Sequence, residues 1–157
     1  MIQSKIKNYW RILKTMQYKS IRRYQSFCKS IDNLKAVDNE TFTSPFALPG
    51  VMQCFCLAFD LSWKVMKDIL TECLGVIDFG IGSPSQTLEQ AFSCGLIDTD
   101  AWKRMLKSRN QLAHDYNGTY AIDMIEMIEK QYLPLLEKFC ASAQKYYNDD
   151  DIQKIDI

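Results

Sequence analysis

Apolar residues recur every three or four positions along most of this chain, which is the spacing of an amphipathic helix. The first region has apolar residues at Ile6, Trp10, Leu13, Met16, Ile21, Tyr24, Cys28, Ile31 and Leu34. Alternating segments of β-branched residues, which would indicate strands, are missing from the sequence. The pattern therefore predicts an all-α protein, with a break in the first helical region near Ser20.

A second region, from Val51 to Leu74, is apolar on more than one face. Its two stripes are Val51, Phe55, Phe59, Trp63, Met66 and Leu70, and Cys54, Leu57, Leu61, Val65 and Ile69. A helix that is apolar around much of its circumference is buried, so we expect this helix to be central. The stretch before it, Asp38 to Gly50, contains Pro45 and Pro49 and predicts a loop.

Turn and capping residues divide the second half of the chain. Three glycines between Gly75 and Gly82 end the central helix, and Ser83-Pro84-Ser85-Gln86 has the pattern of a capping box with proline at the first helical position. We expect a short helix from there to about Cys94, stopped by Gly95. Asp98 is expected to cap the next helix, which carries Trp102, Met105 and Leu106 on its apolar side.

The last predicted helix follows Asn117-Gly118 and starts at Thr119. Its expected apolar face is Ile122, Ile125, Ile128, Tyr132, Leu135, Phe139 and Ala143. Pro134 lies inside this helix and should kink it, because the proline ring clashes with the carbonyl of Lys130. We expect three parts in the chain: a basic N-terminal helical arm (1–20), a helical bundle (21–147) and an acidic, frayed tail (148–157).

Charge is distributed unevenly along the 157 residues, although the net charge is zero. Residues 1–31 contain eight basic and no acidic residues, which leaves 11 basic against 19 acidic residues in the rest. A basic run of this kind is either a solvated helix face or a surface for RNA or an acidic partner. No uncharged apolar run is long enough for membrane insertion or export, so we expect a cytoplasmic protein without a membrane partner.

The six cysteines do not predict a metal site. They contain no CxxC pair and are accompanied by a single histidine, and most of them lie among apolar residues. We interpret them as reduced cysteines of the core and expect neither a metal nor another cofactor.

Candidate chemistry is concentrated between Arg109 and Tyr116. This segment holds the only histidine, His114, beside Arg109, Asn110 and the phenol of Tyr116, in the pattern Arg-x4-His-x-Tyr. Histidine exchanges protons near neutral pH and arginine can clamp a phosphate, so the set suits phosphodiester chemistry. On a regular helix Asn110 and His114 share a face, whereas Arg109 lies about 140° away from His114.

Several further motifs carry a family resemblance. They are Gly82-Ser83-Pro84, Ala91-Phe92, Gly95-Leu96-Ile97-Asp98, Trp102, Met105-Leu106, Arg109-Asn110, His114 and Tyr116-Asn117, together with Phe55, Phe59-Asp60-Leu61, Trp63-Lys64 and Lys67, and Arg23-Tyr24 with Phe27. In order and spacing they resemble the nucleotidyltransferase substrate-binding-protein-like family of the HEPN superfamily. Asp60 stands where that family usually has glutamate. The resemblance covers about residues 22–145, and residues 1–20 have no counterpart in it.

The resemblance implies an antiparallel up-and-down bundle of about five helices that forms a homodimer. It also implies a partner, a minimal nucleotidyltransferase that acts as antitoxin. Related members are ribonuclease toxins that need no metal, which makes Arg109, Asn110 and His114 the candidate catalytic residues at a dimer interface. Their nucleotidyltransferase silences them by adding AMP to a tyrosine, here Tyr116. The implied substrate is RNA, with tRNA as one candidate.

Two other interpretations stay open. In the first, the bundle is a non-catalytic subunit that presents Arg109 and His114 to a nucleotide or to the substrate of the nucleotidyltransferase, which does the chemistry. In the second, the chain is a structural subunit without activity. A histidine near a helix end is also commonly a partner of the helix dipole, and Tyr116 is equally suited to be an interface aromatic.

Overall fold

The computed structural model describes residues 1–37, 44–76, 82–114 and 118–147, and every regular element in these ranges is helical. The α-helices are α1 (Ile2–Lys35), α2 (Ala47–Asp68), α3 (Pro84–Ser93), α4 (Ala101–Leu112), α5 (Thr119–Met127) and α6 (Leu133–Ala143). Two wide π-helical turns, η2 (Ile69–Cys73) and η3 (Ile128–Tyr132), extend α2 and join α5 to α6, and a 3-10 turn, η4 (Gln144–Tyr146), ends the described chain. The predicted all-α bundle is confirmed.

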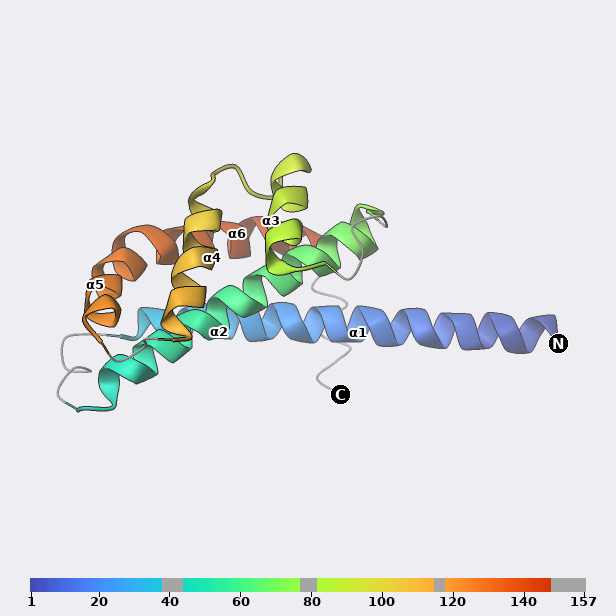
Figure 1. The fold of residues 1–157 in the computed structure, drawn as a ribbon. Coiled ribbons are helices and arrows are strands. Elements are labelled where there is room, and N and C mark those ends of the chain that lie inside the picture. Colours follow the sequence, from blue (N-terminus) through green and yellow to red (C-terminus); the bar gives the residue numbers. More distant parts are fainter. Residues whose placement is uncertain (38–43, 77–81, 115–117, 148–157) are drawn as a thin grey trace.

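Helix α2 is the centre of the bundle, as its two apolar stripes predict. It packs against α1, α3, α4, α5 and α6, and Met52, Phe55 and Phe59 are completely buried. Helix α1 lies along one side of α2, whereas α3 and α4 cross the long helices steeply (Figure 1). Aromatic contacts close the core: the ring of Phe55 stacks on that of Tyr132, with 5.6 Å between ring centroids.

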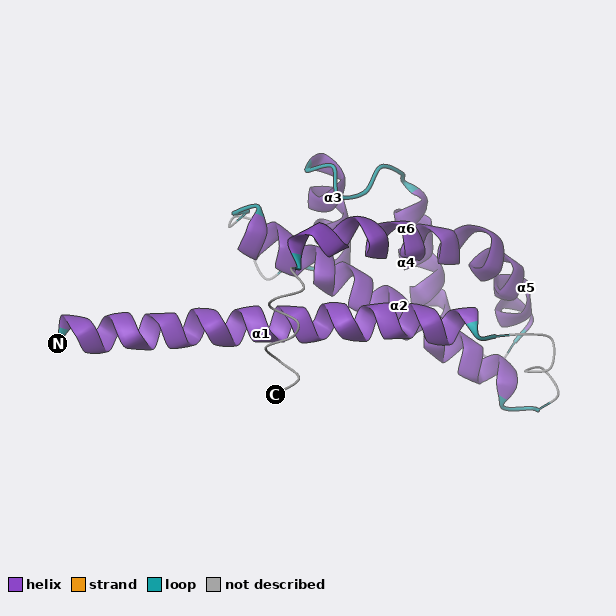
Figure 2. Cartoon of the chain, turned by 180° about the vertical axis from the view of Figure 1, so that it is seen from behind, coloured by secondary structure: helices purple, strands orange, loops and turns teal. Residues whose placement is uncertain are grey.

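Helix α1 runs without interruption through Ser20, so the expected break there is wrong. The Ser20 hydroxyl has one partner inside the helix, the Met16 carbonyl at 3.2 Å, and a closer one on η2, the Glu72 carboxylate, whose two oxygens lie 2.6 and 2.7 Å away. Residues 2–19, which we call the arm, are exposed throughout. The outer part of the arm projects from the bundle (Figures 1 and 2), whereas Trp10, Leu13 and Met16 line a pocket together with Glu72 and Tyr146.

Helix α2 starts within the stretch that was expected to be a loop. The helix includes Pro49 and Gly50, and the Gly50 amide already donates to the Phe46 carbonyl at 3.1 Å. Pro49 is tolerated because it lies in the first turn, where an amide hydrogen has no partner inside the helix. The other end of this helix agrees with the sequence, since Gly75 follows η2 with a positive φ of 67°.

The capping box that opens α3 is confirmed. The Gln86 amide donates to the Ser83 hydroxyl and the Gln86 side chain accepts from the Ser83 amide, both at 3.2 Å. The helix stops as expected at Gly95, which has a positive φ of 76°. Glycine adopts this left-handed conformation readily because it has no Cβ.

The predicted cap of α4 by Asp98 is wrong. Asp100 is the residue at the N-cap position, and the Thr99 hydroxyl accepts from the Ala101 amide at 3.2 Å. The Asp98 carboxylate instead pairs with Lys138 of α6, with 2.7 Å between Nζ and Oδ2. The Asp98 carboxylate therefore pairs with Lys138 on α6 and does not cap the start of α4.

The last helical region bends at η3, next to Pro134, as the proline predicts. The chain changes direction between α5 and α6 (Figures 1 and 2). The wide turn precedes Pro134, which has no amide hydrogen to donate to the helix, so the regular hydrogen-bond pattern is interrupted there. The predicted apolar face is wrong at its start: Ile122 is 59% exposed, whereas Ala121 and Met124 are buried. The wider turn shifts the helical phase, so a strict spacing of three or four residues does not extend across it.

Two of the six cysteines contradict the expectation of core cysteines, because Cys73 and Cys94 are exposed. All six are free thiols, and the other four are half-buried. None of the helices in the described ranges combines the length and the apolar character needed to span a bilayer.

Candidate functional site

An ion pair between α4 and α2 anchors the candidate site. The Arg109 guanidinium donates through Nε and Nη2 to the two carboxylate oxygens of Asp60, at 2.9 and 3.0 Å. Two parallel bonds of this kind fix the orientation of the guanidinium as well as its position. These hydrogen bonds raise the pKa of Arg109, so its positive charge is permanent.

The pair lies at the surface of the bundle, in a small pocket. The side chains of Arg109 and Asp60 are 30% and 29% exposed. The pocket has a volume of about 210 Å³, and its other lining residues are Met52, Gln53, Cys56, Leu57, Leu112 and Ala113. Sites for drug-sized molecules have roughly 300–1,000 Å³. One chain therefore offers room for a phosphate or another small group, but not for a complete nucleotide.

The Cys56 thiol is the other reactive group in this pocket, and its environment keeps it protonated. Burial raises the pKa of Cys56, and the opposing effect of the Arg109 charge is smaller. A thiol must ionise before it acts as a nucleophile. We therefore assign Cys56 to the wall of the pocket.

Asn110 and His114 lie at the surface, close in the chain to this pocket. Helix α4 ends at Leu112, and the next turn is tighter, with the His114 amide donating to the Gln111 carbonyl at 3.1 Å. The side chains of both Asn110 and His114 are exposed, and His114 directly follows Ala113, which lines the pocket. Tyr116, the candidate acceptor of AMP, lies outside the described residues.

The structure thus brings Arg109 together with a residue that the sequence analysis did not assign to the site. Asp60 appeared there only as a replacement within a family motif. One signal could have revealed it, because Asp60 is a charged residue inside the apolar central helix, next to the fully buried Phe59. A carboxylate in that position needs a cationic partner.

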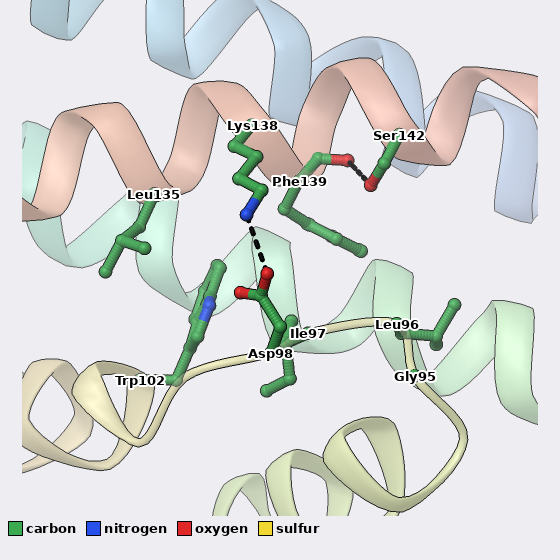
Figure 3. A pocket seen from close by; sticks show the side chains of 9 residues that line it. All are labelled: Gly95, Leu96, Ile97, Asp98, Trp102, Leu135, Lys138, Phe139 and Ser142. Atoms are coloured by element: carbon green, nitrogen blue, oxygen red, sulfur yellow. Dashed lines mark hydrogen bonds and ion pairs between the residues drawn. The ribbon is translucent and has the colours of Figure 1, made fainter.

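A second pocket, of about 160 Å³, contains the motif Gly95-Leu96-Ile97-Asp98 (Figure 3). Its remaining lining residues are Trp102, Leu135, Lys138, Phe139 and Ser142. Figure 3 shows Lys138 reaching from α6 to Asp98, and this hydrogen bond lowers the pKa of Asp98. Ile97 and Trp102 are buried against the core. These residues tie the start of α4 to α6, and so they position the helix that carries Arg109.

No group of three or more histidine, cysteine, aspartate or glutamate side chains suited to a metal ion occurs in the ranges that the structure describes. The charged groups that meet in the pocket are Arg109 and Asp60. They offer a fixed cation and a carboxylate that orients it, and the exposed imidazole of His114 follows Ala113 at the rim of the pocket.

The described chain is a small all-helical bundle that carries Arg109 and His114 near the end of α4. A sequence comparison identifies its family. Residues 19–145 match the family described as nucleotidyltransferase substrate binding protein like. The chain belongs to this family. A comparison with curated proteins finds no match. The matched range includes all four candidate site residues, and it leaves out almost the whole arm.

Proposed function

We propose that this chain is the RNA-cleaving toxin subunit of a two-component system with a minimal nucleotidyltransferase, and that a second copy of the chain completes its active site. The observation that supports the proposal most is the paired Arg109, held by Asp60 at the same end of α4 that leads to His114. Asp60 acts as a positioning residue in this scheme, because it holds the guanidinium in one orientation.

Metal-free RNA cleavage needs three groups. A base removes the proton of the 2′-hydroxyl, an acid protonates the leaving 5′-oxygen, and a cation stabilises the charge on the phosphorane between these steps. One chain supplies one imidazole. Two chains related by a two-fold axis supply a pair of imidazoles, so that one acts as base and the other as acid while Arg109 contacts the phosphate.

The small pocket supports the same arrangement. At about 210 Å³ it cannot enclose a nucleotide alone, and a second chain packed over Ala113 and His114 adds the missing walls. Light scattering should therefore give about twice the chain mass of 18.3 kDa in dilute solution. A mass that stays at one chain in the presence of RNA would contradict this part of the proposal.

A cleavage assay in EDTA tests the chemistry. Wild-type protein should cut RNA and leave a 2′,3′-cyclic phosphate, because the 2′-oxygen is the attacking group. His114→Ala should lower the rate by about 10² or more, and Lys107→Ala, which removes an exposed charge from the same helix, serves as the matched control. Activity that disappears in EDTA and returns with magnesium would refute the mechanism.

Regulation by AMP addition to Tyr116 is the second part of the proposal. An AMP group two residues beyond His114 would compete with the RNA phosphate for Arg109. Intact mass spectrometry after incubation with the nucleotidyltransferase, ATP and magnesium should find added AMP on wild-type protein and on Tyr120→Phe, but not on Tyr116→Phe. Equal modification of all three proteins would exclude Tyr116 as the acceptor.

A non-catalytic subunit that binds a nucleotide or the substrate of the nucleotidyltransferase is the second candidate function. The Asp60 carboxylate favours it, because it offsets the Arg109 charge that a cleaved phosphate would need. The description of the family points in the same direction. In this case RNA stays intact, and Arg109→Ala reduces the turnover of the nucleotidyltransferase with its substrate instead.

A further inference from the structure

Two cysteines on helices far apart in the sequence meet side by side. Cys28 lies on α1 and Cys140 on α6, and their sulfur atoms are 2.9 Å apart. Neighbouring contacts hold the two helices together at this level. The rings of Phe27 and Phe139 are 5.7 Å apart, and the Tyr24 hydroxyl donates to the Cys140 carbonyl at 3.1 Å. The sulfur contact is therefore a fixed feature of the α1–α6 interface.

The two sulfurs are in direct non-bonded contact, at a distance from which a disulfide can form with a small movement. A disulfide has about 2.05 Å between its sulfur atoms, so the two thiols need to approach by less than an ångström. Both side chains are half-buried and thus reach the surface in part. A small reagent in solution has access to them, in contrast to a thiol in the closed core.

The two thiols differ in acidity. The hydrogen bond from Cys140 lowers the pKa of Cys28 to about 7, and the same contact raises the pKa of Cys140. The lowered pKa favours the thiolate of Cys28, and the thiolate is the nucleophilic form. Cys28 is suited to attack first and Cys140 to act second.

We propose that Cys28 and Cys140 form a redox-active pair that closes to a disulfide between α1 and α6 when the protein meets a low-molecular-weight disulfide. The Cys28 thiolate attacks one sulfur of the reagent and displaces the other half, which takes up a proton as a free thiol. Cys140 then loses its proton and attacks the Cys28 sulfur, which expels the second half of the reagent. Two protein thiols are oxidised, and one small disulfide is reduced to two thiols.

The closed form differs from the open form in stability. A bond between residues 28 and 140 encloses most of the chain, and this reduces the conformational freedom of the unfolded state. We expect the oxidised protein to melt about 5–10 °C higher than the reduced protein. This site does not use Arg109 or His114, so it stands independently of the proposed ribonuclease function.

Redox titration of the full chain tests the pair. The exposed Cys73 and Cys94 are first changed to serine, which prevents bonds between molecules. The protein is equilibrated with mixtures of reduced and oxidised glutathione, its remaining thiols are alkylated, and its peptides are mapped by mass spectrometry. Two thiols should disappear together, and a peptide that links Cys28 to Cys140 should appear with the higher melting temperature.

Single variants in the same background separate the two roles. Cys140→Ser should trap glutathione on Cys28, whereas Cys28→Ser should leave Cys140 unmodified under the same conditions. The proposal fails if both thiols are still alkylated at the most oxidising mixture, or if the mapped disulfide joins other cysteines. Alanine variants replace the serine variants if circular dichroism indicates unfolding. Peptide mapping of the protein that keeps both Cys28 and Cys140 shows whether the disulfide forms, and it needs neither single variant.

Discussion

The two halves of α1 have the same sequence pattern and opposite surroundings. In the inner half, the stripe residues Ile21, Tyr24, Ile31 and Leu34 are 5%, 7%, 4% and 3% exposed, and Cys28 is half-buried beside the fully buried Phe27. In the arm, they are 48%, 59%, 37% and 46% exposed, in the order Ile6, Trp10, Leu13 and Met16. Periodicity thus predicts a helix and the face that could be buried, but it does not determine whether a neighbour covers that face.

The family comparison divides the helix at the same place. The match starts at residue 19, and burial starts at Ser20. The inner half therefore belongs to the range that matches the family, and nearly all of the arm lies outside that range. The following predictions test this difference, beginning with the largest expected effect.

Phe27→Ala should destabilise the protein by about 3–5 kcal/mol, because it empties a fully buried position in the inner half. The ring packs against Phe139 of α6, so its removal leaves a cavity between two helices. Urea unfolding followed by circular dichroism measures the loss. A change below about 1 kcal/mol would mean that the inner half contributes no more to stability than the arm does.

A pH effect is expected where the inner half meets the end of α2. Arg23 Nη1 lies 2.6 Å from the Asp68 carboxylate. Burial raises the pKa of Asp68 to about 6, and it outweighs the attraction of Arg23. The folded protein then binds this proton more tightly than the unfolded chain, in which the pKa is about 3.9.

Stability should therefore rise by about 1–3 kcal/mol as the pH falls through 6 towards 4. Asp68→Asn should flatten this part of the pH profile, measured as unfolding free energy at each pH. Asp98→Asn is the matched control, because the pKa of Asp98 is lowered and its effect falls below this window. An unchanged profile in Asp68→Asn would contradict the assignment.

Trp10→Ala and Leu13→Ala should destabilise the protein by about 0.5–1.5 kcal/mol, far less than Phe27→Ala, because Trp10 is 59% and Leu13 37% exposed where they line a pocket beside Glu72. The same urea experiment used for Phe27→Ala gives the comparison directly. A loss above about 2 kcal/mol that depends on protein concentration would instead indicate that another copy of the chain covers the arm.

The parts of the fold that the sequence predicted depend on neighbours along the chain. The capping box of Ser83 and Gln86, the stop at Gly95 and the central helix around Phe55 are local patterns, and the structure confirms them. The errors at Ser20 and Asp98 have one cause. Each side chain finds its partner on a distant element, Glu72 or Lys138, and such a choice is fixed only by packing.

In the candidate site, too, the local features were predictable from the sequence and the contacts between distant elements were not. The position of Arg109 near the end of a helix was predictable from the apolar spacing of Trp102 and Met105. The pairing of Arg109 with Asp60 was not, because the two residues lie 49 positions apart. Their meeting depends on how α4 crosses α2, which depends in turn on packing around buried residues such as Met105.

The continuity of α1 has a consequence for how the arm becomes ordered. An isolated helix must first form an unfavourable initial turn, and short helices are marginal in water for this reason. Here the packed inner half supplies that turn, so the arm only has to propagate a helix that already exists. Propagation from one end leaves the other end the most frayed, and Met1 provides no side-chain hydrogen bond to cap it. Amide exchange in the arm should accordingly slow from residue to residue, from its tip towards the bundle.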